Sequence, residues 1–223
     1  MSEPIVINDI DQYTFEFTNN KLILTLKQQQ INTHDDTQIT KLYISNKNLT
    51  TLPNNLPQNL QTLYCGWNQL TALPNNLPPN LQELLCHNNQ LITLPNNLPQ
   101  NLQHLYCSNN QLTILPNNLP QNLEILYCYG NKLTSLPDKL PQNLKELHCY
   151  NNKLTILPNL PTSLTCIDLH NNPLEANYPL IFTFKLKQAS EFVAYVNIRN
   201  AEMLADAQNK LAETQKLIAM LSK

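Results

Sequence analysis

Five cysteines recur in this chain at intervals of 21 residues, each inside the phrase Leu-x-x-Leu-x-Cys-x-x-Asn-x-Leu. They are Cys65, Cys86, Cys107, Cys128 and Cys149. A strict period of this length indicates a stacked array, in which each copy covers the apolar side of its neighbour. The repeat therefore constrains the fold more strongly than any local propensity does.

The repeat extends beyond the five cysteine copies in both directions. A first copy opens at Ile39, where Ile44 takes the cysteine position, and a last copy opens at Leu164 with Leu169 in that position. We therefore expect seven units. They divide the chain into an N-terminal capping segment of residues 1–38, a solenoid of residues 39–178 and a mainly helical C-terminal segment of residues 179–223.

Each unit joins two halves of different character. One half repeats Leu-Pro-Asn-Asn-Leu-Pro-Gln-Asn, as in residues 94–101, and its prolines exclude a regular helix and a central strand. This half should be extended or polyproline-like. In the other half buried and exposed positions alternate, which predicts a short strand. Stacked strands form a parallel sheet, and without crossover helices one face of that sheet stays uncovered.

The repeat phrase resembles the leucine-rich repeat family, whose pattern L-x-x-L-x-L-x-x-N-x-L is met by Leu102, Leu105, Cys107, Asn110 and Leu112. Cysteine at the third apolar position is the one systematic departure. The resemblance implies a curved solenoid with its parallel sheet on the concave face.

Within that family, the short repeat with LP-x-x-LP is similar to the class in bacterial effectors and in proteins of large amoeba-infecting DNA viruses. In such a setting the partner would be a host factor. Some similar effectors carry a C-terminal ubiquitin ligase domain with a catalytic cysteine. No cysteine follows Cys166 here, so this activity is not expected.

Two interior columns have structural explanations. An asparagine recurs where each coil turns away from its strand, and its carboxamide can satisfy the backbone of two coils at once. These residues are Asn68, Asn89, Asn110, Asn131 and Asn152. The cysteines could alternatively bind a row of metal ions, form disulfide bonds between coils or act as a redox relay, but the sequence contains no Cys-x-x-Cys pair. We expect buried, reduced thiols there, and a more reactive Cys166 on the solvent face.

Composition excludes several classes of function. The 14 basic and 16 acidic residues leave no basic patch for nucleic acid, and no apolar run is long enough for a membrane span. The start of the chain lacks the pattern of a signal peptide, and reduced thiols indicate a cytoplasmic location. With two glycines in the chain there is no phosphate-binding loop. We expect no enzyme activity, cofactor or metal.

One polar cluster is an alternative to that expectation. His148 and Asp168 occupy equivalent positions of neighbouring strands, and His170 follows two residues later. Together they could bind a divalent metal or form a base with its orienting carboxylate. No serine or cysteine nucleophile is expected beside them, so a solvated polar face is the simpler interpretation.

The outward positions of the strands are rich in aromatic residues. Threonine could largely supply the sheet stability of a solvent face, whereas tyrosine and tryptophan are enriched at binding hot spots. The candidate partner-binding residues are Tyr64, Trp67, Tyr106, Tyr127, Tyr129 and Tyr150. The competing explanation is that the stacked aromatic side chains only stabilise neighbouring strands of the sheet. Seven strands give a face of about 600 Å², which suits a modest protein or peptide epitope.

The two ends should cap the array. Residues 13–17 and 22–26 predict a β-hairpin over the first coil. Residues 180–187 are ambiguous, and a helix is expected from Asn200 with Glu202 in its first turn. One apolar stripe follows this helix, at Leu204, Ala207, Leu211, Thr214, Ile218 and Leu221. The stripe predicts packing on the last repeat, or a short coiled coil that joins two copies.

The sequence thus predicts a non-enzymatic protein-protein interaction module. A partner protein of unknown identity would bind its concave, aromatic-rich sheet, and the chain would be a monomer or a weak homodimer. The alternative is a structural or assembly component that associates through the C-terminal helix.

Overall fold

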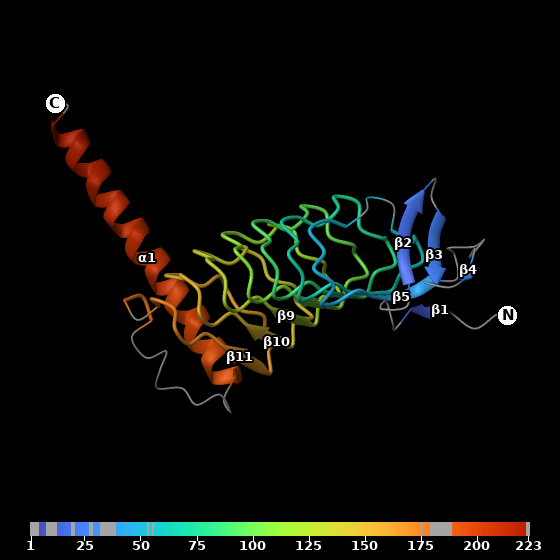
Figure 1. Cartoon of the computed structure of the whole chain (residues 1–223). Helices are drawn as coiled ribbons and strands as arrows, with labels where there is room; N and C mark the ends of the chain where they lie inside the picture. Colours follow the sequence, from blue (N-terminus) through green and yellow to red (C-terminus); the bar gives the residue numbers. More distant parts are fainter. Residues whose placement is uncertain are drawn as a thin grey trace.

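The computed structural model describes residues 5–7, 13–18, 21–26, 29–31, 39–52, 54, 56–174, 176–178 and 189–221. Side chains are described within these ranges from residue 39 to residue 215. The chain forms a stack of similar coils, with strands labelled β1 to β5 at one end and the helix α1 at the other (Figure 1).

The predicted parallel sheet of seven repeat strands is confirmed. Each strand pairs in register with the next, so that Leu63 lies beside Leu84 and Leu84 beside Leu105. The strands are β5 Ile39–Tyr43, β6 Thr62–Tyr64, β7 Glu83–Leu85, β8 His104–Tyr106, β9 Ile125–Tyr127, β10 Glu146–His148 and β11 Cys166–Asp168. An eighth strand that the repeat does not predict, β1 Ile5–Ile7, pairs in parallel with β5.

The proline-rich halves connect the strands without helices in the described residues between β5 and β11. In each of these halves a leucine N–H donates to a proline carbonyl three residues earlier, as from Leu102 to Pro99 at 3.1 Å. The absence of a crossover helix follows from the prolines, which cannot donate to a helical ladder. Within the described part of the chain, no helix or second sheet layer covers the other face of this sheet, as the sequence predicts.

Leucine and cysteine fill the interior of the coils. Leu102, Leu105, Cys107 and Leu112 have no solvent exposure, and the equivalent residues of the neighbouring coils repeat this arrangement. Full burial of one leucine side chain stabilises a fold by about 1.5 to 3 kcal/mol. Burial of the five column cysteines is as predicted, and it raises the pKa of the Cys86 thiol to about 12.

The asparagine column joins adjacent coils, as predicted. The Asn110 carboxamide oxygen accepts from the Leu91 N–H at 3.0 Å. Its amide nitrogen donates to the carbonyls of Cys86, Cys107 and Ser108 at 3.1, 3.1 and 3.2 Å. Asn110 is only 8 % exposed, so water cannot take the place of its carboxamide as the hydrogen-bond partner of these backbone groups.

The N-terminal segment contains the predicted hairpin. Strand β2, Tyr13–Thr18, pairs antiparallel with β3, Lys21–Leu26, and the short strand β4, Gln29–Ile31, follows on the other side of β3. The third strand of this separate sheet is not predicted by the sequence pattern. The proposed role of the hairpin as a cap stays a prediction.

The C-terminal helix begins earlier than predicted. Helix α1 spans Ala189–Leu221, so the expected start at Asn200 is wrong, and Glu191 rather than Glu202 lies in the first turn. The residues of its first turns are aromatic and β-branched and have no strong local preference for helix. Burial of Phe192, Val193 and Val196 decides in favour of the helix. The ambiguous residues 180–187 lie outside the described ranges.

Polar contacts attach the first half of α1 to the last coil. The Asn197 carboxamide accepts from the Leu160 N–H at 2.7 Å and donates to the Leu160 carbonyl at 2.9 Å. The hydroxyl of Tyr178, which is fully buried, donates to Asn200 Oδ1 at 2.6 Å. This half of the helix therefore covers the end of the core.

The predicted apolar stripe lies beyond these contacts. Leu204 is 60 % exposed and Leu211 is 59 % exposed, so packing of these two residues on the last repeat is wrong. The second half of α1 runs away from the coils (Figure 1). Of the other stripe residues, Ile218 and Leu221 lie outside the described side chains.

Candidate functional site

The uncovered face of the sheet is built from three outward columns, which together we call the concave face. The middle residue of each short strand is buried, while the residues before and after it are in most strands partly exposed. From β6 to β11 the first column is Thr62, Glu83, His104, Ile125, Glu146 and Cys166. The second is Tyr64, Leu85, Tyr106, Tyr127, His148 and Asp168, and the third is Gly66, His87, Ser108, Tyr129, Tyr150 and His170.

Aromatic rings in the second column contact one another from strand to strand. Tyr43 stacks on Tyr64 with ring centroids 4.5 Å apart and ring planes at 10°. Further along, Tyr106 meets Tyr127 edge to face at 5.0 Å, and Tyr127 lies 4.4 Å from His148. Because Leu85 occupies the position between Tyr64 and Tyr106, the column forms two aromatic groups.

The third column adds a second stack beside the larger of these groups. Tyr129 stacks on Tyr150 at 4.3 Å and Tyr150 on His170 at 4.4 Å, with ring planes within 10° in both pairs. A contact of 6.5 Å between Tyr127 and Tyr129 links the two columns. Four of the six predicted binding residues therefore form one aromatic cluster, namely Tyr106, Tyr127, Tyr129 and Tyr150.

Two glutamates that the sequence interpretation missed accompany the tyrosines. The hydroxyl of Tyr127 donates to Glu146 Oε2 at 2.6 Å, and the hydroxyl of Tyr64 donates to Glu83 Oε2 at 3.3 Å. The hydrogen bond to Glu146 raises the pKa of Tyr127 above its usual range, and burial with the nearby Glu83 raises the pKa of Tyr64 to about 12. Glu83 also contacts His104 Nδ1 at 3.4 Å.

Trp67 occupies an unusual backbone position beside this face. Its φ angle is +54°, in the left-handed region, and its side chain is 61 % exposed. The equivalent residues of the other coils, all with positive φ, are Asn46, Asn88, Asn109, Gly130, Asn151 and Asn171. Asparagine and glycine tolerate this conformation, whereas a bulky side chain is strained in it. The indole contacts His87 edge-on at 6.3 Å, which leaves most of its surface in solvent.

The polar cluster at β10 and β11 differs from its predicted form. Asp168 Oδ1 lies 2.6 Å from His170 Nδ1, while His148 Nε2 lies 3.4 Å from Cys166 Sγ. The expectation that no cysteine lies beside these residues is therefore wrong. Cys166 is on the outward side, as predicted, because its register partner is Glu146.

The chemistry of this cluster is not that of an activated nucleophile. Burial, Glu146 and Asp168 all raise the pKa of the Cys166 thiol, whereas a reactive cysteine needs a lowered pKa. Among the described residues, no group of three or more histidine, cysteine, aspartate or glutamate side chains is arranged to hold a metal ion.

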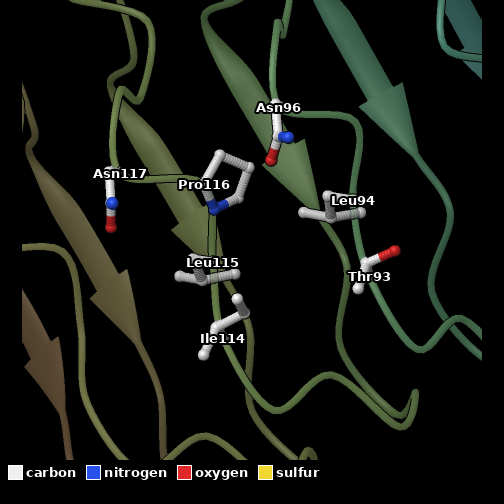
Figure 2. A pocket seen from close by; sticks show the side chains of 7 residues that line it. All are labelled: Thr93, Leu94, Asn96, Ile114, Leu115, Pro116 and Asn117. Carbon is white, nitrogen blue, oxygen red and sulfur yellow. The ribbon is translucent and has the colours of Figure 1, made fainter.

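A hollow of about 90 Å³ lies between two neighbouring coils, away from the aromatic columns (Figure 2). Its lining comes from the segments that follow the asparagine column, and consists of Thr93, Leu94, Asn96, Ile114, Leu115, Pro116 and Asn117. Sites for small molecules are usually about 300 to 1,000 Å³, so this hollow is too small for such a ligand. Within the described ranges, no helix is both long enough and apolar enough to cross a membrane.

Comparison with protein families agrees with the repeat geometry. Residues 100–141 match the family model "Leucine Rich repeats (2 copies)", and residues 143–164 match "Leucine Rich Repeat". No curated protein sequence matches the chain significantly.

Three solved structures of leucine-rich repeat proteins illustrate the similarity. YopM from Yersinia pestis is 38 % identical, with 63 % of this chain and 45 % of YopM covered and a TM-score of 0.52. A Shigella effector LRR domain is 36 % identical, with 60 % and 59 % covered and a TM-score of 0.54. An LRR protein of Leptospira interrogans is 32 % identical, with 62 % and 45 % covered and a TM-score of 0.55. The chain spans less than two thirds of each of these proteins.

Proposed function

We propose that this leucine-rich repeat protein, similar in structure to bacterial effectors, is a non-enzymatic module that binds a partner protein on its concave face. The observation that carries the proposal is Trp67. A tryptophan at positive φ costs about 1 to 2 kcal/mol of stability, and an indole that is 61 % exposed recovers little of this by burial. A hot-spot role at an interface explains its presence.

The aromatic cluster supports the same proposal. Stacked tyrosines such as Tyr129 and Tyr150 stabilise neighbouring strands by up to about 1 kcal/mol per pair, so their stacking alone does not require a partner. Ring faces and hydroxyls that remain partly exposed also provide large contact area at a low cost in side-chain entropy. We assign the binding role to Tyr64, Trp67, Tyr106, Tyr127, Tyr129 and Tyr150.

Affinity capture with a matched pair of variants tests the proposal. We expect a partner retained by the unmodified protein to be lost by Tyr106→Ala/Tyr127→Ala/Tyr129→Ala. The control is Ile92→Ala/Ile114→Ala, which removes exposed apolar side chains on the outer segments. Melting curves must show that all three proteins are fully folded at the temperature of the capture experiment. Retention of the same partner by the tyrosine variant would contradict the proposal.

The setting of this function is a further part of the proposal. Similarity to the Yersinia and Shigella effectors supports a host protein as the partner. The five buried thiols are compatible with a reducing compartment such as the cytoplasm. We propose a solenoid of residues 39–178, closed by the N-terminal segment 1–38 and the C-terminal segment 179–223.

The second half of α1 supports one alternative function, association of two copies. Leu204 and Leu211 are exposed on a helix that extends beyond the last coil. Helical segments of this length are marginal in water unless their apolar face is packed. A dimer should show a mass of about twice 25.6 kDa in solution and revert to a monomer in Leu204→Lys/Leu211→Lys. A monomer at all concentrations would exclude this alternative.

A further inference from the structure

We infer that the partner segment bound by the concave face carries arginine side chains, with two of them about four residues apart in an extended stretch. This inference rests on the proposed binding function of that face. It adds the chemical class of the partner, which neither the repeat pattern nor the similar structures supply.

The first observation is the charge of the face. Among the outward columns of β6 to β11, all within the described residues, three positions are acidic and none is lysine or arginine. The acids are Glu83, Glu146 and Asp168. Lys41 of β5 lies beside Thr62, and Glu83 and Asp168 each contact a histidine. With neutral histidines, the part of the face from β6 to β11 therefore carries negative charge. A partner segment with positive charge is complementary to this part of the face, whereas nucleic acid and anionic lipid surfaces are not.

The second observation is that the same aromatic and acidic pair occurs twice. Tyr64 contacts Glu83 across β6 and β7, and Tyr127 contacts Glu146 across β9 and β10. Each pair places a carboxylate beside the ring of a tyrosine. A guanidinium group stacks on aromatic rings and binds carboxylates through two parallel hydrogen bonds, so such a pair suits arginine better than lysine.

The two carboxylates differ in their contacts: both oxygens of Glu83 have one, from the Tyr64 hydroxyl and from His104, while at Glu146 the contact is to one oxygen. The Tyr127 hydroxyl donates to Oε2, so a guanidinium that binds both oxygens would take Oε1 and the remaining lone pair of Oε2. Between the two pairs lies Tyr106, whose pKa is raised by burial and then by both Glu83 and Glu146. Tyr106 thus lies near both carboxylates, between the two tyrosine–glutamate pairs.

The spacing of the two pairs gives the spacing of the arginines. Tyr64 and Tyr127 lie on β6 and β9, three strand positions apart. At about 4.8 Å per strand this is roughly 14 Å. An extended chain advances about 3.4 Å per residue and turns every second side chain to the same side, so residues i and i+4 match the distance.

A peptide-display selection tests the inference. A random twelve-residue library would be selected against the unmodified protein, Glu83→Gln/Glu146→Gln and Tyr127→Ala/Tyr129→Ala. Glutamine keeps the hydrogen-bond acceptor for each tyrosine and removes the charge. The matched control is Glu124→Gln, because Glu124 precedes its strand and pairs with Lys145 at 2.6 Å. Melting curves of all variants establish that each is folded.

The expected result is enrichment of peptides with arginines four residues apart on the unmodified protein and on Glu124→Gln. In fluorescence anisotropy, the best peptide should lose at least tenfold in affinity for Glu83→Gln/Glu146→Gln. Replacement of its arginines by citrulline, the neutral isostere, should cause a similar loss.

The outcomes separate this inference from the proposed function. Peptides that bind the glutamine variant equally but are lost on Tyr127→Ala/Tyr129→Ala would overturn the arginine inference and leave the concave face as the binding surface. If no peptide is enriched on the unmodified protein, or if enrichment is the same on all variants, both the inference and the binding role of this face are contradicted.

Discussion

Within each coil, the inward and outward columns differ in how much they vary. The inward position after the central leucine is cysteine in five successive coils, and an asparagine follows three residues later in each. In the same coils, the outward position between the central leucine and the cysteine is tyrosine, leucine, tyrosine, tyrosine and histidine. The interior is constrained because every coil must satisfy the same backbone groups and fill the same space. The concave face has no such constraint, so its composition can serve recognition.

The largest effect is expected from a change in an interior column. Asn110→Leu removes an acceptor from the Leu91 N–H and a donor from two or more buried carbonyls. We expect a loss of about 3 kcal/mol in the free energy of unfolding. Chemical denaturation measures this value. Asn118→Leu, at an exposed position, is the control, and an equal loss there would show that the column is not special.

A smaller loss is expected in the cysteine column. Cys107→Ser places a hydroxyl among apolar side chains at a position with no exposure, which should cost about 2 kcal/mol. The half-buried Cys166→Ser should cost less than about 1 kcal/mol, because its hydroxyl can reach solvent. The same denaturation experiment compares the two. Similar losses at both positions would contradict the distinction between the inward and outward columns.

At Trp67 the expected change in stability has the opposite sign. Trp67→Asn places at φ +54° the residue type found at five equivalent positions, and should stabilise the fold by about 1 kcal/mol. Asn88→Trp, the reverse exchange in the next coil, should destabilise it by a similar amount. Thermal melting measures both. If Trp67→Asn lowers the melting temperature, the indole contributes to stability and the main argument for its binding role is lost.

The smallest effect is expected within the aromatic cluster. Tyr127→Phe removes the hydrogen bond to Glu146, which is partly exposed, and should cost about 0.5 to 1 kcal/mol. Tyr106→Phe is the matched control, because Ile125 occupies the position where the partner glutamate would lie. We expect no more than about half of the Tyr127→Phe loss there. A loss of about 3 kcal/mol in the free energy of unfolding at either position would show that the aromatic cluster mainly stabilises the fold.

Periodicity alone was sufficient to predict the repeated part of the molecule. Strands, buried leucines and cysteines, and the asparagine bonds all follow from one 21-residue pattern, which five successive coils satisfy fully and the first and last coils in part. The outward tyrosines could be placed on one face for the same reason. Their pairing with glutamates could also have been found, because each glutamate follows its tyrosine by 19 residues.

Other features depend on contacts that no local pattern encodes. Strand β1 is three residues long and lacks the repeat phrase. Its pairing with β5 depends on the open edge that the folded repeat sheet presents, which no local sequence pattern predicts. The first turns of α1 are helical because Phe192 and Val196 are buried at the end of the core. The contact of His148 with Cys166 is a diagonal one across two strands and depends on side-chain rotamers.

Photo-crosslinking tests the central claim that the concave face is the recognition surface. A benzophenone amino acid would replace Tyr127 on that face, or Ile114, which is 58 % exposed on the outer segments. Irradiation with the captured partner should give a crosslinked product of defined mass from position 127 and none from position 114. A crosslink from position 114 alone would contradict the account and place recognition on the opposite side of the solenoid.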